Sequence, residues 1–577
     1  MIIQELCHYY DRLRDNPDMD ISEPGFSREK IHAEVVLDEN GNLLQFNDLR
    51  IQKGKNLVPK EMIVPQSFKR PGSKAHEAPF FLWDNTGFVF GKDAKENNQK
   101  TQLKFENFRR HHVKLLSQST QKDVQIFVSF LSNWNISNAN NLKNWKELAG
   151  GNVVFRIDGE REYLHEKKSL KEIWLQYLAT QKATLEGFCM ITGKRTPIAR
   201  THPSVKSFSS TGSALVSFND NAYESYGKKQ NYNAPVGEMS AFTYTTALNY
   251  LLASNSKQKI RIGDDTAVFW TERQSPVEGM LGQILDPKDT ELADSANIKQ
   301  FLEAVRDSKK LPDIDCDIKF YILGISPNKA RIAVRFWHIC TVGQLKERIG
   351  QHFKDLQMIR SRDSDPEFPS IWRLLQETIN KKSSDTPQPL LAGAVMRSIL
   401  EGTVYPQALQ NALINRIRSE SALKDKNGKP INNVNYVRAA MLKAILNQKN
   451  RIYKNSMEVP MALDKENKNT AYLLGRLFAV LEKVQQDALG QNINATIKDR
   501  FFGSASATPA AVFPQLLRLA QHHIGKAEYG KTRDKQIEEV ICDIKDFPAH
   551  LSLDQQGLFA IGYYHQRQSF FQKKDKE

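Results

Sequence analysis

The stretch KFYILGISPNKARIAVRFWHICT, residues 319–341, holds the point at which the predicted secondary structure changes type. Two runs rich in β-branched and aromatic residues, Lys319–Ile325 and Arg331–Trp337, flank the turn signal Ser-Pro-Asn-Lys at 326–329, and this pattern predicts a β-hairpin. Period-two alternation stops near Thr341, and helical periodicity takes over to the end of the chain. The hairpin is therefore the last β element that we expect.

Helix caps and apolar faces follow throughout the C-terminal part. Tyr405-Pro406 opens a helix with Leu409, Leu413, Ile414 and Ile417 on one face, Asn469 caps a second helix, Thr508-Pro509 begins a third and Lys535–Ile544 forms another. The sequence thus predicts an α+β fold. We expect a mixed α/β N-terminal part over residues 1–345 and an all-α helical-bundle domain over residues 346–577.

The N-terminal part alternates short strands with helices. Two further hairpins are predicted, one with Asp-Glu-Asn-Gly at 38–41 between Ile31–Leu37 and Leu43–Phe46, the other with Asp-Asn-Thr-Gly at 84–87 between Phe80–Trp83 and Phe88–Phe90. A strand is predicted at Val153–Ile157, before an Asp-Gly pair. Helices are expected at Leu6–Leu13, Ser169–Thr180, Met239–Leu252 and Asn297–Arg306.

The composition is typical of a globular protein, and the length allows several domains. The chain has 577 residues, of which 40% are hydrophobic and 25% charged. It contains no apolar run long enough to span a bilayer and its N-terminus lacks the form of a signal peptide, so we expect a cytoplasmic protein with no membrane partner. The five cysteines include no CxxC pair, which fits a reducing compartment. Cys189 has no second Cys or His at ligand spacing and is expected to be a small buried residue.

Positive charge is concentrated in two stretches of a chain whose formal net charge is +15. Residues 329–454 hold 22 Lys and Arg against 10 Asp and Glu, and residues 50–74 hold seven cations against one acid. Separate basic surfaces are typical of nucleic-acid binding. A solvated, highly charged helical surface is the other interpretation.

No motif in the sequence indicates an active site. The dinucleotide-binding pattern GxGxxG is absent, and GKAEYGKT at 525–532 has the spacing GxxxxGK[ST] but follows the helix predicted from Pro509 rather than the strand that a phosphate-binding loop requires. The tandem histidines His111-His112 and His522-His523 would face about 100° apart on a helix, so one metal ion could not easily bind both. Acidic groups at Asp264-Asp265 and at 313–317 could hold Mg²⁺ in principle, but turns and strand edges with solvated carboxylates are commoner. We therefore expect no enzyme activity, no catalytic residue, no cofactor and no bound metal.

Residues 218–252, FNDNAYESYGKKQNYNAPVGEMSAFTYTTALNYLL, combine flat aromatic rings, amides and cations ahead of a predicted helix. The candidates for nucleic-acid contact here are Asn219, Tyr226, Lys228, Lys229 and Asn233. On composition alone, an ordered surface loop leading into the helix is the alternative.

A second candidate is the proline-bounded loop VPQSFKRPGSK at 64–74. The residues able to donate to base edges or phosphates of a duplex are Lys69, Arg70, Ser73 and Lys74, together with Lys53 and Lys55 upstream in the same basic stretch. A mobile connecting loop is the competing interpretation.

Short motifs spread over nearly the whole chain carry a resemblance to a known family. They are the 218–252 segment and the runs Phe188–Gly193, Ala267–Trp270, Tyr321–Asn328, Val334–Trp337, Ala471–Phe478, Ala495–Arg500 and Gly562–Gln568. In number and order they resemble the large subunit of the type I-C CRISPR surveillance complex (Cascade). The likeness is looser over the N-terminal part, which includes the 64–74 loop.

The resemblance implies a subunit that reads the short PAM duplex beside the target, helps to open the DNA, stabilises the R-loop and supports recruitment of the nuclease-helicase. The implied partners are crRNA, target double-stranded DNA and its displaced strand, the Cascade backbone subunits, the repeat-cleaving subunit and small subunits. It assigns PAM or DNA contact to Lys53, Lys55, Lys69, Arg70, Ser73 and Lys74, and contact with a strand backbone to Arg476, Lys498 and Arg500.

Arg476 and Arg500 have a structural alternative, because either could be buried and paired with acids such as Asp499 or Glu482. The resemblance also implies that the C-terminal part is similar to the small subunit, which internal translation could produce from Met457 or Met461. Two other classes of function stay open. One is a metal-dependent defence nuclease, and the other is a structural scaffold without direct DNA contact.

Overall fold

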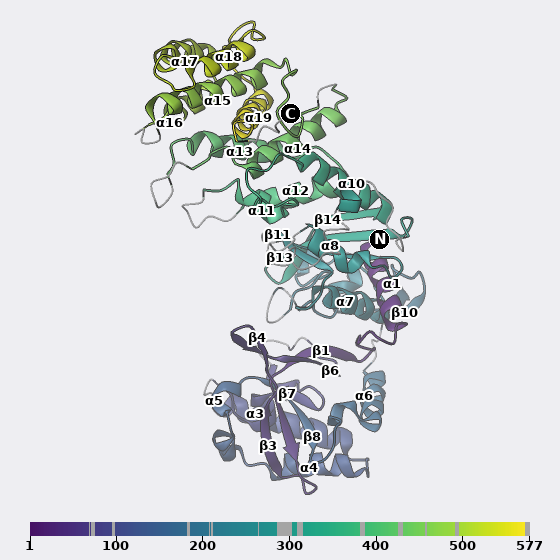
Figure 1. Ribbon diagram of the computed structural model, residues 1–577. Helices are drawn as coiled ribbons and strands as arrows, with labels where there is room; N and C mark the ends of the chain where they lie inside the picture. Colours follow the sequence, from purple (N-terminus) through teal and green to yellow (C-terminus); the bar gives the residue numbers. More distant parts are fainter. Residues whose placement is uncertain are drawn as a thin grey trace. The chain divides into compact units, whose positions relative to one another are not determined.

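The structure is a computed structural model that describes residues 1–68, 70, 75–94, 98–181, 185–206, 208, 212–262, 265–285, 303–307, 315–380, 387–424, 431–455, 458–490 and 495–571 (Figure 1). Its contacts divide the chain into two compact units. Unit 1 contains residues 1–256 with 327–333, and unit 2 contains residues 257–326 with 334–577.

Strands end at Thr341, and no strand follows among the described residues, so the predicted α+β class is confirmed. The division into units does not follow this change of secondary structure, because the last sheet packs with the helices of unit 2. A domain boundary at residue 345 stays a prediction.

Unit 1 is built on a mixed four-stranded sheet. Its elements are α1 (Ile2–Arg14), β1 (Phe26–Ile31), β2 (Ala33–Leu37), β3 (Leu43–Asp48), β4 (Ile51–Lys53), β5 (Asn56–Val58), β6 (Lys60–Pro65), η1 (Ala75–Glu77), β7 (Trp83–Asn85), α2 (Thr86–Phe90), α3 (Asn98–Leu116), α4 (Lys122–Asn133), η2 (Ile136–Asn141), α5 (Trp145–Leu148), β8 (Asn152–Ile157), η3 (Leu164–Glu166), α6 (Lys168–Thr180), β9 (Glu186–Phe188), β10 (Arg195–Pro197), η4 (Asn221–Tyr223), η5 (Gln230–Asn233) and α7 (Glu238–Leu252). The sheet has the order β3-β2-β8-β7, with β2 parallel to β8 and the other pairs antiparallel.

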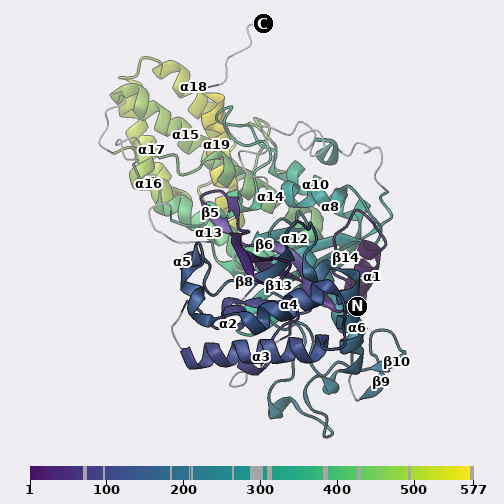
Figure 2. The same cartoon turned by 90° about the horizontal axis from the view of Figure 1, so that it is seen from below.

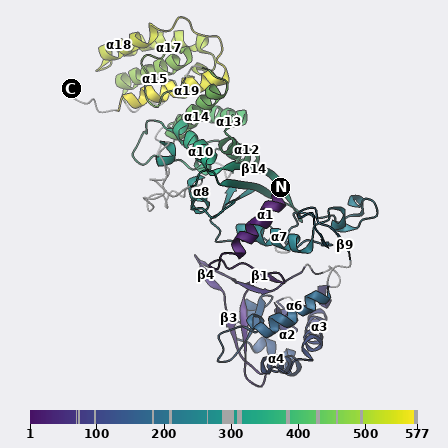
Figure 3. The same cartoon turned by 90° about the vertical axis from the view of Figure 1, so that its right-hand side faces the viewer.

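Figure 3 shows the helices of unit 1 beside this sheet. Aromatic side chains fill the space between the sheet and the helices. Phe155 of β8 lies 4.8 Å, centroid to centroid, from Phe127 of α4, and Phe108 of α3 joins the same cluster. All three are buried, and aromatic pairs of this kind add to the free energy gained from area burial.

The expected single strand at 31–37 is divided in two at His32. The His32 amide donates to the carbonyl of Asn152, and the Asn152 amide donates back to Nδ1 of His32. β1 therefore pairs with β6, whereas β2 enters the four-stranded sheet. The strand expected at Val153–Ile157 is confirmed as β8.

Two of the three predicted hairpins are confirmed. At 38–41 the carboxylate of Asp38 accepts from the amides of Asn40 and Asn42 and closes the turn between β2 and β3. The hairpin around 326–329 forms as β13 (Lys319–Asn328) and β14 (Arg331–Thr341).

The hairpin predicted around 84–87 is wrong. Asn85 caps a helix by accepting from the Gly87 amide, and Thr86–Phe90 forms α2, which ends at Gly91 in the left-handed region. Every residue of α2 is buried, so packing against α3 outweighs the preference of the Phe-Val-Phe run for a strand.

The helix pair α1 and α7 completes unit 1. Tyr9 and Tyr10 of α1 make edge contacts with Tyr250 and Phe242 of α7, at 6.4 Å and 5.8 Å between centroids. The helices expected at Leu6–Leu13, Ser169–Thr180 and Met239–Leu252 are confirmed as α1, α6 and α7. The helix expected at Asn297–Arg306 lies outside the described residues except for its last turn.

Unit 2 combines the antiparallel sheet β11-β12-β13-β14 with a helical core. Its elements, with the two hairpin strands already named, are β11 (Lys259–Ile262), β12 (Asp265–Thr271), α8 (Val277–Leu285), α10 (Val342–Leu356), α11 (Ile371–Gln376), α12 (Pro389–Glu401), α13 (Gln407–Ser419), α14 (Tyr436–Ile452), α15 (Thr470–Leu489), α16 (Ile497–Ala505), α17 (Pro509–Ile524), α18 (Gly530–Ile541) and α19 (Leu553–Ser569). The predicted cap of α15 is confirmed, because Asn469 accepts from two of its amides. Thr508 and Pro509 lie at the start of α17 as predicted, but the Thr508 hydroxyl donates to the Ser504 carbonyl and makes no capping hydrogen bond.

Helices α15 and α19 lie side by side, as Figures 2 and 3 both show. Two glycines permit their close approach. A Cβ built on Gly475 would lie 2.0 Å from the carbonyl oxygen of Phe559, and one on Gly562 would lie 2.2 Å from that of Tyr472. Any larger residue at either position would force the two helices apart.

Candidate nucleic-acid interface

The basic stretch at 50–74 contains an exposed β-ribbon formed by β4 and β5. Residues 51–57 are all exposed, including the apolar Ile51 (53%) and Leu57 (49%). Lys53 and Lys55 flank Gly54, which adopts a φ of +61° and has open space where a Cβ would lie. A two-stranded ribbon has dimensions that fit the major groove of a duplex. Sequence reasoning identified the lysines but not the ribbon or its two exposed apolar side chains.

Arg70 points inward. Its side chain is only 16% exposed, and its guanidinium lies over the rings of Phe80 (3.8 Å) and Phe88 (4.1 Å). Nε donates to the carbonyl of Ala78 at 2.7 Å, and Nη2 pairs with the fully buried carboxylate of Asp84. The guanidinium of Arg70 thus binds groups of its own chain, and these contacts anchor Arg70 within the loop that was predicted to read the PAM.

Asp84 is the buried partner of Arg70. Burial raises the pKa of its carboxyl to about 6, although the charge of Arg70 and the amides of Phe80 and Asn85 favour the ionised form. Close to this pair, Phe68 is 48% exposed and lies 5.2 Å from Phe80, which stacks on Trp83 at 4.6 Å. The remaining predicted members of this site, Lys69, Ser73 and Lys74, lie outside the described residues.

The 218–233 loop presents Tyr226 at its tip. Tyr226 has a φ of +51° and Gly227 a φ of +70°, and the Lys228 amide donates to the Ser225 carbonyl at 3.0 Å. Positive φ at both central residues is the signature of a type I′ turn, in which Asn-Gly is favoured and a bulky aromatic at the first position is strained. The Tyr226 side chain is nevertheless 97% exposed, and Lys228 and Lys229 beside it are exposed as well.

The amide side chains of the loop hold this turn in place. Asn233 accepts from the Ser225 amide at 2.9 Å and donates to the carbonyls of Lys228 (2.7 Å) and Gln230 (2.8 Å). Asn219 accepts from Arg331, whose guanidinium lies 4.5 Å from the centre of the Tyr223 ring. Of the five predicted contacts, Tyr226, Lys228 and Lys229 are exposed to solvent, whereas the exposed Asn219 and the half-buried Asn233 form hydrogen bonds within the chain.

The three cations predicted to contact a strand backbone have different environments. Arg476 of α15 is 2% exposed, and its Nε donates to Gln566 at 3.2 Å. Lys498 is 3% exposed and donates to the carbonyl of Ile431 at 3.1 Å, and burial lowers its pKa. Arg500, two residues further along α16, is exposed. Only Arg500 of the three is placed where a strand could reach it.

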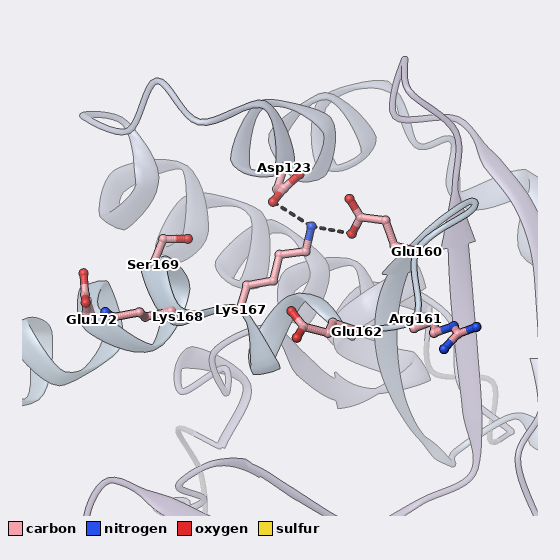
Figure 4. Close-up of a pocket in the computed structure, with 8 residues that line it drawn as sticks. All are labelled: Asp123, Glu160, Arg161, Glu162, Lys167, Lys168, Ser169 and Glu172. Atoms are coloured by element: carbon pink, nitrogen blue, oxygen red, sulfur yellow. Dashed lines mark hydrogen bonds and ion pairs between the residues drawn. The ribbon is translucent and has the colours of Figure 1, made fainter.

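An open, charged depression of about 760 Å³ lies on unit 1 around the start of α6 (Figure 4). Lys167 points between Asp123, at 2.6 Å, and Glu160. Burial works against its charge, yet the hydrogen bonds to these two carboxylates raise the pKa of Lys167 above its usual range. Lys167 therefore neutralises Asp123 and Glu160 within the depression. Among the described residues, no group of three or more His, Cys, Asp and Glu side chains is arranged to hold a metal ion.

Buried histidines and cysteines have packing roles. His112 is fully buried, accepts from the Leu82 amide and has its pKa lowered to about 3 by burial. Cys189 is buried as expected, and its Sγ accepts from the Gly237 amide at 3.2 Å. Neither residue belongs to the two exposed cationic sites, which are the β4–β5 ribbon with Lys53 and Lys55 and the turn with Tyr226, Lys228 and Lys229.

No helix in the described part of the chain is both long and apolar enough to cross a membrane.

Comparisons with known proteins agree with the sequence motifs. A search of curated proteins gives no match. Residues 6–571 match the family described as CRISPR-associated protein (Cas_Csd1), which confirms the resemblance at the level of a CRISPR-associated protein. Since this match spans almost all of the 577 residues, the chain belongs to the CRISPR-associated Cas_Csd1 family.

Proposed function

We propose that the protein is the non-catalytic, DNA-binding large subunit of a type I-C CRISPR surveillance complex. In this proposal it reads the PAM, helps to open the target, stabilises the R-loop and supports recruitment of the nuclease-helicase, which performs the cleavage. Its partners are crRNA, target DNA with its displaced strand, and the other Cascade subunits. The family match over residues 6–571 supports a CRISPR role, and the two exposed cationic sites support direct contact with nucleic acid.

The observation that carries the proposal is the turn at Tyr226. A fully exposed aromatic ring on a strained backbone contributes nothing to the core, so folding alone does not explain it. A rigid ring beside two lysines suits an unpaired base with a phosphate on either side. We therefore assign Tyr226, Lys228 and Lys229 to contact with an unpaired strand.

The β4–β5 ribbon is our candidate for contact with the PAM duplex. Lys53 and Lys55 are exposed at its tip, while Arg70 anchors the following loop through Asp84. In Cascade-type complexes base pairing with the guide supplies most of the sequence information, so a small protein element is enough for PAM reading. Arg500 is assigned to a strand backbone as a separate contact.

The test is binding of a PAM-containing target by the assembled complex. Tyr226→Ala should weaken binding about 5- to 150-fold, which corresponds to ~1–3 kcal/mol for one stacked base. Tyr226→Phe keeps the ring and should bind normally. Lys53→Ala with Lys55→Ala should reduce the salt slope of binding by roughly one unit for each phosphate that is no longer neutralised. Lys168→Ala, an exposed lysine on α6, is the matched control.

Two results would overturn this assignment. If the Tyr226 and lysine variants all bind as the unaltered complex does, the chain is a scaffold without direct DNA contact. If the purified protein degrades DNA in the presence of a divalent metal, and one Asp substitution abolishes this, the protein is a nuclease.

We also propose that internal translation from Met457 or Met461 supplies a small subunit. Helices α15 to α19 follow these methionines, and α15, α16 and α19 pack on one another through Phe478, Phe502 and Phe559, within a core that they share with α13 and α14. Met461 is exposed in the connector before α15, and Met457 lies outside the described residues. Replacing both methionines with isoleucine should remove a fragment of about 13 kDa, at about 110 Da per residue, from the purified complex. Persistence of that fragment would contradict the proposal.

A further inference from the structure

The hairpin formed by β9 and β10 exposes large apolar side chains. Phe188 is 72% exposed and Met190 61%, on either side of the buried Cys189. Leu185 (46%) and Met239 (55%), in the first turn of α7, add to the same region. Scattered single apolar residues are normal on a protein surface, whereas several on one rigid element indicate an interaction site.

Hydrogen bonds hold the hairpin firmly against the start of α7. The thiol of Cys189 accepts from the amides of Gly237 (3.2 Å) and Ile191 (3.4 Å) and donates to Ser240 Oγ (3.6 Å). The Met190 amide donates to the carbonyl of Pro235 at 2.9 Å. Because Cys189 faces inward, its two neighbours are directed away from the protein. The apolar side chains are therefore presented in a fixed arrangement, and little entropy would be lost on binding.

The chemistry of this surface differs from that of the Tyr226 turn. Three of its four apolar side chains are Leu or Met, which lack the flat face on which a base stacks. Phe, Met and Arg are the residue types enriched at the centres of protein interfaces. The edge of the hairpin carries the exposed cations Lys194, Arg195 and Arg200, with Arg195 lying 3.5 Å from Glu186. An apolar centre with a cationic edge is complementary to an apolar recess with an acidic rim.

The surface is also continuous with the proposed nucleic-acid site. The Asn231 amide of the 218–233 loop donates to the carbonyl of Arg200 at 3.3 Å, and the Ala199 amide donates to the carbonyl of Val236 at 2.9 Å. A protein bound at the hairpin would therefore lie next to a strand bound at Tyr226.

We propose that Phe188 and Met190 form a docking site for another protein subunit of the complex, whose recess is apolar and rimmed by acids that face Lys194 and Arg200. This inference rests on the proposed role as a subunit of a multi-protein complex. Phe188 is the anchor because it has the largest exposed apolar surface on the hairpin, and buried aromatic anchors carry most of the binding energy at interfaces.

Site-specific photocrosslinking in the purified complex tests this proposal. Phe188 is replaced by p-benzoylphenylalanine, which keeps an aromatic side chain at the position, and adducts are identified by mass spectrometry. We expect a crosslink to one other protein subunit. The same probe at Leu175, an exposed apolar position on α6 (43%), should give no crosslink to that subunit. An adduct with DNA or RNA, with a second copy of this chain, or no adduct at all would overturn the proposal.

A second measurement follows association directly. Phe188→Ala should weaken association with the other subunits at least about 30-fold, as expected for an interface hot spot. Leu175→Ala should leave it unchanged. Both variants should unfold at the same temperature as the unaltered chain, because both side chains are largely exposed. Unchanged association of Phe188→Ala would overturn the proposal even if the crosslink is found.

The experiment separates failure of this inference from failure of the proposed function. If the unaltered chain assembles and binds target DNA but the Phe188 results are negative, only the docking site is refuted. If the unaltered chain assembles with no other subunit, both are refuted.

Discussion

The 218–233 loop and the helix pair α15–α19 both carry cations within family-like motifs, yet the structure treats them in opposite ways. In the loop, Lys228 and Lys229 are exposed beside Tyr226, while amides take over the internal hydrogen bonding. In the helices, Arg476 is buried and its donors are taken by the chain itself. A cation in a motif therefore indicates binding only where its local backbone presents it to solvent. Substitutions at internal and exposed positions test this distinction.

The largest effect is expected for Arg70, an internal cation in a region first assigned to DNA contact. Arg70→Ala leaves the carboxylate of Asp84 buried without its partner, and should lower the free energy of unfolding by about 3–5 kcal/mol. Chemical denaturation of the purified chain measures this. The double variant Arg70→Met with Asp84→Asn has no buried charge at this site, so it should be more stable than Arg70→Ala, although less stable than the unaltered chain. A stability change below about 0.5 kcal/mol would mean that Arg70 is free to read bases.

Arg476 and Arg500 give the comparison within the helices. Arg476→Ala should lower the free energy of unfolding by about 1.5–3 kcal/mol, because it removes charged hydrogen bonds inside the core, and should leave the salt slope of DNA binding unchanged. Arg500→Ala should do the opposite, with unchanged stability and a slope smaller by roughly one unit. Denaturation and binding at two salt concentrations check both variants, and an exchange of the two results would reverse the assignment.

Glycines test whether close packing of α15 on α19 fixes the helical core. Gly475→Ala places a Cβ 2.0 Å from the Phe559 carbonyl and should cost about 1–3 kcal/mol of stability. Gly503→Ala in α16, where the nearest side-chain atom lies 3.9 Å away, should instead stabilise by about 0.4–1 kcal/mol. Thermal unfolding of the two variants would show shifts of opposite sign. Equal shifts would mean that α15 and α19 are free to move apart.

The smallest effect separates strain from binding at Tyr226. Asn suits the first position of a type I′ turn better than Tyr, so Tyr226→Asn should stabilise the chain by about 0.5–1 kcal/mol while weakening binding of an unpaired strand. Denaturation and a binding titration measure the two quantities on one sample. A variant that is more stable and also binds normally would remove the reason for a tyrosine at this position.

Much of the local structure could be predicted from the sequence. Apolar periodicity and caps identified the helices that follow Pro406, Asn469 and Thr508 and the one that overlaps Lys535–Ile544, and turn signals identified the hairpins at 38–41 and 326–329. The family resemblance was also present in the motifs, and the match over residues 6–571 agrees with it. These features are predictable because they depend on residues close together in the chain.

The tertiary structure decided what the sequence left open. Packing against α3 made α2 a helix where turn chemistry predicted a hairpin, and Asp84 drew Arg70 inward from the loop where it was expected to face DNA. The same folding left Phe188 and Met190 exposed although their residue types favour burial. Most helices and turns, but not Thr86–Phe90, follow from local propensity, whereas the exposure of a particular side chain depends on contacts from distant parts of the chain.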